Sequence, residues 1–80
     1  MSKKPKSAKR WGNLPITVDP QVMSGDPVFA GTRVPVESLF TNLAGGVSLD
    51  EYLDAFPDVK RSQAMAVLDY AHQSVIKAAA

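Results

Sequence analysis

Apolar positions at helical spacing dominate the second half of the chain. From Val36 to Leu43 they fall at i, i+3, i+4 and i+7, and Gly45-Gly46 follows as a stop signal. Pro35 suits the first turn of this helix, where its missing N–H has no partner to lose. Ser48 and Glu51 then form a Ser-x-x-Glu capping box ahead of a second apolar repeat. The pattern predicts two short helices joined by a tight turn.

A longer third helix is expected from about Lys60 to about Lys77. The side chains expected on its buried side are Ala64, Met65, Leu68, Ala71, Val75 and Ile76. Two short helices followed by a longer one have the outline of a helix-turn-helix domain, although many other small bundles share it.

Two short β-prone runs precede the helices, at residues 16–18 and 28–30. Between them, residues 24–27 read as a turn, because Gly25 permits a positive φ and Pro27 sets the exit. Such runs around a loop predict a small antiparallel ribbon. The expected fold is therefore mainly α: a three-helix, helix-turn-helix domain preceded by a short β-ribbon.

The charge is unevenly distributed along the chain. Residues 1–10 carry +5 from Lys3, Lys4, Lys6, Lys9 and Arg10, whereas residues 11–80 carry four cations against eight acids, a balance of −4. We interpret residues 1–13 as a disordered basic arm, with Trp11 docking where order begins, residues 14–77 as one domain and residues 78–80 as a tail. A basic arm on an acidic body is typical of polyanion binding, and a solubilising tail is the alternative.

Candidate DNA contacts lie in the first turn of the third helix, where a recognition helix meets base edges: Lys60, Arg61, Ser62 and Gln63. An ordinary solvated helix start is the alternative. Arg33, the only cation between residues 11 and 59, indicates either a specific carboxylate or phosphate partner, with DNA as the candidate, or an internal pair with Asp19 or Asp26.

Catalytic groups are scarce in this sequence. The chain has no cysteine and a single histidine, His72, which we expect at the surface or half-buried. No spacing of acids or histidine is typical of a metal site, and no phosphate-binding glycine pattern is present. We therefore expect neither an enzyme nor a cofactor or metal; a small hydrolase is the weakest hypothesis. No apolar stretch is long enough to span a bilayer, so a cytoplasmic location is expected.

One stretch resembles a known family. Residues 24–36, with their Gly-Thr-Arg-x-Pro-Val core at Gly31–Val36, are similar to a widespread prokaryotic family of small proteins, domain-of-unknown-function family four-three-three. The resemblance covers about residues 14–72 and extends to Gly45-Gly46 and Phe56-Pro57. It implies a homeodomain-like or winged-helix-like fold. It also implies a VapB-like antitoxin that binds a PIN-like nuclease toxin and represses its operon through operator DNA, as a homodimer. The family often has Ser or Thr where this chain has Lys60, and the basic arm lies outside the shared region.

Two readings of function follow. In the first, the chain is an antitoxin whose third helix and arm contact DNA. In the second, it is a pure protein-interaction module whose acidic body covers a basic, nucleic-acid-binding groove. A stand-alone transcriptional regulator without a toxin is a further alternative to the first.

Overall fold

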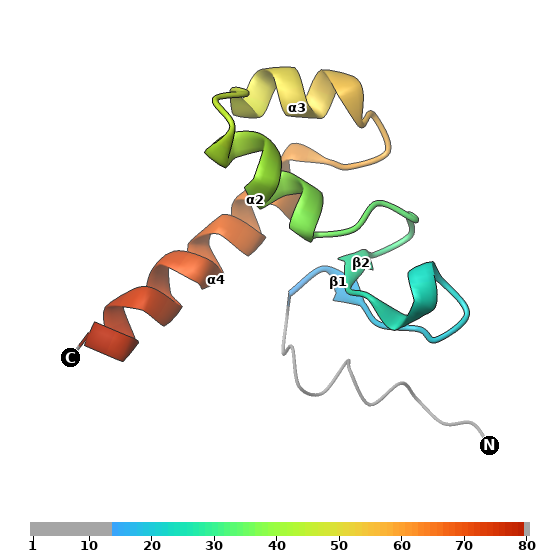
Figure 1. Cartoon of the computed structure of the whole chain (residues 1–80), viewed down its shortest axis with the longest axis horizontal. Helices are drawn as coiled ribbons and strands as arrows, with labels where there is room; N and C mark the ends of the chain where they lie inside the picture. Colours follow the sequence, from blue (N-terminus) through green and yellow to red (C-terminus); the bar gives the residue numbers. More distant parts are fainter. Residues whose placement is uncertain (1–13, 80) are drawn as a thin grey trace.

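A small β-hairpin followed by three helices makes up the described part of the chain (Figure 1). The structure is a computed structural model, and it describes residues 14–79. The strands are β1 (Ile16–Thr17) and β2 (Val28–Phe29), and the helices are α2 (Glu37–Ala44), α3 (Leu49–Ala55) and α4 (Arg61–Ala79). The mainly helical fold with a preceding ribbon is confirmed. The predictions for the arm and for Trp11 lie outside the described residues.

The hairpin pairs its strands antiparallel, with Ile16 opposite Phe29 and Thr17 opposite Val28. Its connection contains the short 3-10 turn η1 (Met23–Gly25), in which Ser24 has φ 57° and Gly25 φ 89°. Glycine adopts such angles without the Cβ clash that other residues suffer. The predicted turn at Gly25 is confirmed, but serine carries a strained conformation beside it.

Pro35 lies outside the helix in which the sequence pattern placed it. Residues 34–36 run along β2 instead: the Phe29 N–H donates to the Val34 carbonyl at 3.0 Å, and Pro35 forms an isolated β-bridge with Val28. This pairing holds the proline in extended geometry, so α2 begins only at Glu37. Residues 34–36, which lead directly into α2, are therefore hydrogen-bonded to the hairpin.

The turn between α2 and α3 follows its predicted signals. Gly46, at φ 98°, donates its N–H to the Leu43 carbonyl at 3.1 Å, and Val47 donates to Asn42 at 3.0 Å. These two bonds are those of a Schellman motif, which needs a left-handed residue at its centre. Across the turn, Ser48 and Glu51 form the predicted capping box with bonds of 2.9 and 3.1 Å.

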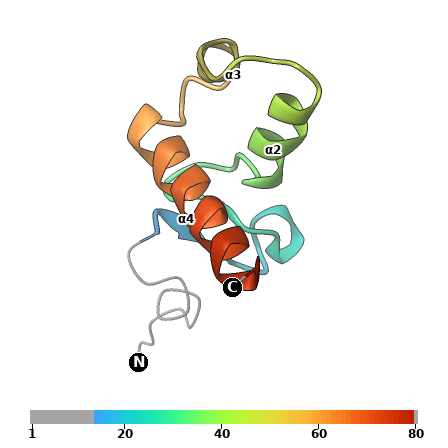
Figure 2. The same cartoon turned by 90° about the vertical axis from the view of Figure 1, so that its left-hand side faces the viewer.

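The core collects one or two residues from every element. Its buried members are Ile16, Val28, Phe29, Leu39, Tyr52, Val59, Ala64 and Val67. The helices α2 and α3 pack on one another, and the hairpin lies beside the first half of α4 (Figure 2). Tyr52 is fully buried, and its hydroxyl donates to Ser38 Oγ at 2.8 Å, since that Oγ itself donates to the Pro35 carbonyl at 2.7 Å. Burial raises the pKa of the Tyr52 phenol above its usual 10.0.

The buried side predicted for α4 is wrong at three of its six positions. Ala64 is buried and Leu68 and Ala71 are half-buried, but Met65, Val75 and Ile76 are 50%, 65% and 53% exposed. Val67, absent from the prediction, is buried instead. The hairpin and the other helices cover only the first half of α4, so Val75 and Ile76, further along, meet nothing in the described chain (Figure 1). Met65 lies within the covered half, on a side of the helix that faces solvent.

No helix within residues 14–79 combines the length and apolar character needed to cross a membrane.

Candidate functional site

The first turn of α4 is exposed but tied to its own protein. Lys60, Arg61 and Ser62 all lie at the surface. Arg61 forms an ion pair with Asp50 at the start of α3, and both side chains remain more than half exposed. A surface pair of this kind contributes little stability, so it does not prevent Arg61 from contacting another molecule. The predicted DNA contacts at these three residues stay predictions.

Gln63, the fourth candidate in this turn, is engaged at both ends of its amide. Its Oε1 accepts from the Lys60 backbone N–H at 2.9 Å, and its Nε2 donates to the Ala30 carbonyl at 3.1 Å. The first bond satisfies an amide at the helix start, and the second joins α4 to the hairpin. The sequence pattern could not reveal these two bonds, and the predicted DNA contact at Gln63 stays a prediction, because the amide keeps a second N–H and a second oxygen lone pair.

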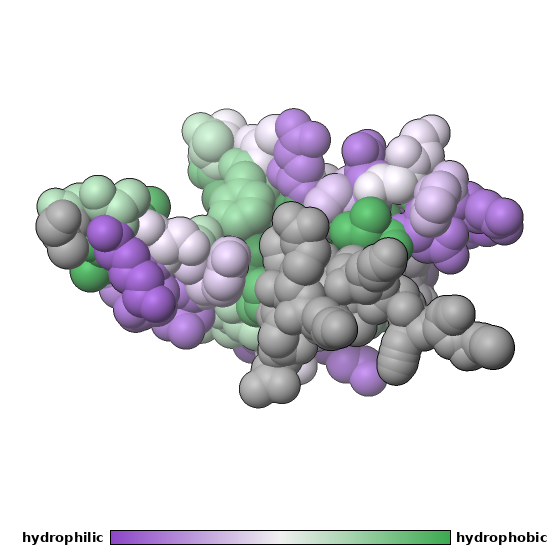
Figure 3. Space-filling view, turned by 90° about the horizontal axis from the view of Figure 1, so that it is seen from below, coloured by the Kyte–Doolittle hydropathy of each residue, from purple (hydrophilic) through white to green (hydrophobic). Residues whose placement is uncertain are grey.

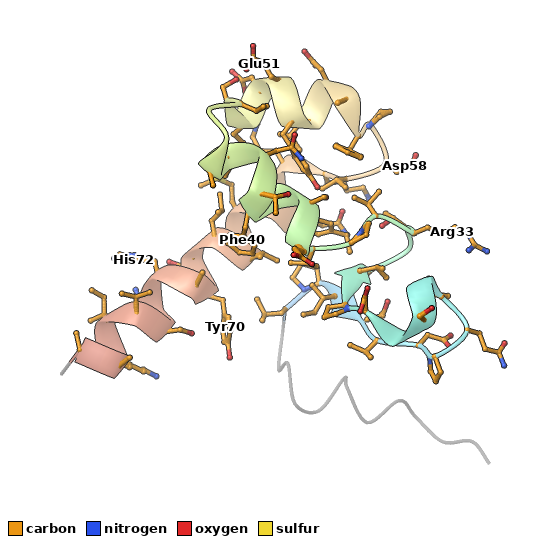
Figure 4. The ribbon with its side chains drawn as sticks, viewed as in Figure 1. Arg33, Phe40, Glu51, Asp58, Tyr70 and His72 are labelled. Atoms are coloured by element: carbon orange, nitrogen blue, oxygen red, sulfur yellow. The ribbon has the colours of Figure 1, made fainter. Side chains whose placement is uncertain are left out.

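Acidic side chains gather at the same end of the molecule. Asp50, Glu51 and Asp54 lie exposed on α3, and Asp58 follows in the turn that leads to α4. In Figure 4 the labelled Glu51 and Asp58 both lie at the α3 end of the molecule, away from the hairpin. Four carboxylates around two cations make this end an unfavourable place for a polyanion.

Arg33 stands on a loop whose other residues are all bonded internally. Thr32 Oγ1 donates to the Phe29 carbonyl and accepts from the Val34 N–H, both at 2.9 Å. Gly31 turns the chain at φ 79°. Arg33 is exposed and points away from the body (Figure 4), and among residues 14–79 it has no ion pair. The predicted pair with Asp19 or Asp26 is therefore not found; the Asp19 carboxylate accepts instead from the Gln21 N–H at 2.9 Å.

The end of α4 carries apolar side chains that the described chain leaves uncovered. Every residue from His72 to Ala79 is exposed, in agreement with the expectation for His72. We define the free face of α4 by four exposed residues that share one side of the helix at i, i+7, i+10 and i+11: Met65, His72, Val75 and Ile76. Figure 3 shows green, apolar atoms at the far left, where α4 ends, next to purple, polar ones.

Taken together, a hairpin followed by three helices, the last and longest of them projecting, places this chain among the small trihelical domains of helix-turn-helix outline. The chain belongs to the family described as "Protein of unknown function (DUF433)", whose model matches residues 16–71. The predicted family is thus confirmed.

Two relatives illustrate how far the likeness reaches. The uncharacterized protein y4eO of Sinorhizobium fredii (strain NBRC 101917 / NGR234) is 31% identical over 62 residues, which are 78% of this chain but 28% of that protein. The chain thus spans less than a third of that relative. The crystal structure of a DUF433 member protein from Anabaena variabilis ATCC 29413 has a TM-score of 0.66 and 22% identity, covering 92% of this chain and 80% of the other. It shows a shared fold.

Proposed function

We propose that the chain is the antitoxin of a toxin–antitoxin pair, which neutralises a PIN-like nuclease by binding it directly and represses its own operon by binding DNA. The observation that carries the first half is the free face of α4. Val75 and Ile76 are 65% and 53% exposed on a helix end that nothing in residues 14–79 supports. A helix segment of this length is marginal in water by itself, so a partner that covers it stabilises it as well.

Charge indicates what kind of partner fits. Residues 11–80 have a balance of −4, and acids crowd the α3 end. The groove of a nuclease that holds nucleic acid is basic, so an acidic protein complements it. Docking an amphipathic helix into an apolar groove is a common mode of recognition, with anchors at the spacing that the free face of α4 has.

Binding to a PIN-like nuclease, sought among the products of the neighbouring genes, tests the proposal. We expect Val75→Ser/Ile76→Ser to weaken binding at least about 100-fold, because each buried aliphatic side chain contributes about 1.5–3 kcal/mol. The matched control is Tyr70→Ser/Gln73→Ser, which changes two exposed residues of the same helix outside the free face. Equal affinities for both double variants, measured by calorimetry on proteins of equal helicity, would exclude the free face as the toxin-binding surface.

DNA binding is the second half of the proposal, and the arm supports it. Five cations in residues 1–10 offer phosphate contacts that the acidic body lacks. Lys60, Arg61, Ser62 and Gln63 remain the candidates for contact on the body, and the amide of Gln63 keeps one N–H and one oxygen lone pair beyond its two internal bonds. We propose that the DNA-bound form is a homodimer, since two copies double the arm's contacts and match a palindromic operator.

A gel shift with the chain's own promoter tests this half. We expect binding that weakens steeply between about 50 and 200 mM salt, and that is lost when the five arm cations are changed to Gln. Loss of binding in Lys60→Gln/Arg61→Gln with an intact arm would instead move the interface to α4. A wild-type chain that shows no salt-sensitive shift, with or without the nuclease, rules out autorepression.

A further inference from the structure

We infer that the loop of residues 30–34 is a rigid mount for Arg33, which it presents to a carboxylate on the protein partner. The inference rests on the proposed nuclease-binding function. It begins from the observation that this short loop is held at both ends and across its middle. The Ala30 N–H donates to the Pro15 carbonyl at 2.8 Å, and the Ala30 carbonyl accepts from Gln63 at 3.1 Å.

The middle of the loop is fixed by Thr32. Its backbone N–H and its Oγ1 both donate to the Phe29 carbonyl, at 3.0 and 2.9 Å, and Oγ1 also accepts from the Val34 N–H. The Phe29 N–H closes the loop on the Val34 carbonyl at 3.0 Å. With Gly31 supplying the left-handed turn, each neighbour of Arg33 has a structural task.

Arg33 itself has no such task within the described chain. Every Asp and Glu of the sequence lies in residues 14–79, yet none pairs with Arg33. The fold therefore does not account for an arginine at this position. A guanidinium is a planar fork that binds carboxylates through two parallel hydrogen bonds, and a mount that is already rigid lowers the entropic cost of forming them.

A carboxylate fits this position better than the phosphates of a nucleic acid. Arg33 is the only cation between residues 11 and 59, a region that holds Asp19, Asp26, Glu37 and the acids of α3. A single cation in an acidic region is complementary to the reverse arrangement on a basic protein, which is a single carboxylate surrounded by cations. A polyanion needs several cations along its path, and these are concentrated in the arm.

The test measures binding of Arg33 variants to two probes: the PIN-like nuclease, and a nonspecific DNA duplex. We expect Arg33→Ala to weaken nuclease binding at least about tenfold, as truncation of one partner of a buried charge pair does. Arg33→Lys should recover only part of the affinity, because it keeps the charge and loses the fork. Lys77→Ala, which removes an exposed cation outside the free face of α4, should leave nuclease affinity unchanged. Because the Arg33 side chain is exposed and forms no ion pair within residues 14–79, the melting temperature of Arg33→Ala should stay close to that of the wild type.

Thr32→Val tests whether the rigidity of the loop contributes to binding. We expect it to keep Arg33 but to weaken nuclease binding by less than Arg33→Ala does, because only the loop's order is lost. Unchanged nuclease affinity in Arg33→Ala overturns the inference while leaving the proposed function intact. A loss confined to the DNA duplex overturns it in favour of a phosphate contact. If the wild-type chain fails to bind the nuclease at all, the proposed function falls, and this inference falls with it.

Discussion

Substitution of Gln63 tests whether this side chain stabilises the fold or contacts DNA bases. Its amide bridges the start of α4 and the hairpin, through Lys60 N–H at 2.9 Å and the Ala30 carbonyl at 3.1 Å. Gln63→Ala removes both bonds and leaves the half-buried Ala30 carbonyl without this partner. Gln63→Glu keeps an acceptor for the Lys60 N–H but places a carboxylate oxygen, which cannot donate, beside the Ala30 carbonyl. Its effect on stability therefore reports the loss of the bond to Ala30.

The expected cost follows from the exposure of each partner. The Lys60 N–H is at the surface and can bind water when Gln63 is removed, so its loss costs about 0.5 kcal/mol. The Ala30 carbonyl is partly buried, and leaving it unsatisfied costs about 1 kcal/mol or more. Gln63→Ala should thus lower the free energy of unfolding by about 1–2 kcal/mol, which lowers the melting temperature of a domain this size by roughly 4–16 °C.

Urea and thermal unfolding followed by far-UV circular dichroism measure this cost, and the promoter gel shift measures DNA affinity on the same samples. Ser62→Ala is the control for the unfolding measurements alone, because the side chain of Ser62 is exposed and has no hydrogen bond among the described residues. Gln63→Glu should be destabilised at neutral pH despite favouring the helix dipole. A Gln63→Ala protein with wild-type stability but weakened promoter binding would refute the structural role and restore base reading.

Three further changes probe other parts of the fold. Tyr52→Phe should lower the unfolding free energy by about 0.5–1.5 kcal/mol through the lost bond to Ser38. Because burial raises the folded pKa of Tyr52 above 10.0, the unfolded chain loses the phenol proton first, and stability should fall as pH rises past 10 in the wild type by more than in Tyr52→Phe. Ser48→Ala should cost about 1 kcal/mol by removing the cap from the Glu51 N–H, as urea unfolding will show. Ser24→Gly should raise the melting temperature, with a gain of about 0.5–1 kcal/mol from relief of φ 57°, whereas Ser24→Ala should not.

Local signals predicted the parts of the fold that depend on neighbours in sequence. The Ser48 capping box, the glycine stop at Gly45-Gly46 and the turn at Gly25 all involve groups a few residues apart, and the structure confirms each. Helix and strand spacing likewise predicted a hairpin followed by three helices. Such features are predictable because the residues that form them also specify them.

The predictions from sequence are wrong where contacts between residues distant in sequence determine the structure. Pro35 suits a helix start by its own chemistry, but pairing with Val28 holds it in extended backbone. The spacing in α4 marks Met65, Val75 and Ile76 as apolar but contains no information on where the body ends, so the pattern cannot separate a core face from an uncovered one. At Gln63 the spacing shows the position in the helix but not the bond to Ala30, far away in sequence, so the structural role of this side chain could not be predicted.

Residues 31–36, the Gly-Thr-Arg-x-Pro-Val motif of this chain, also combine structural residues with one residue that the fold does not need. Gly31, Thr32 and Pro35 each satisfy a condition of the backbone: a left-handed turn, two hydrogen bonds on one hydroxyl, and an extended bridge to β2. The shape of the loop does not depend on Arg33, whose side chain takes part in none of these backbone interactions and forms no ion pair within residues 14–79. The motif therefore joins two kinds of residue, those that build a rigid loop and one that the loop displays.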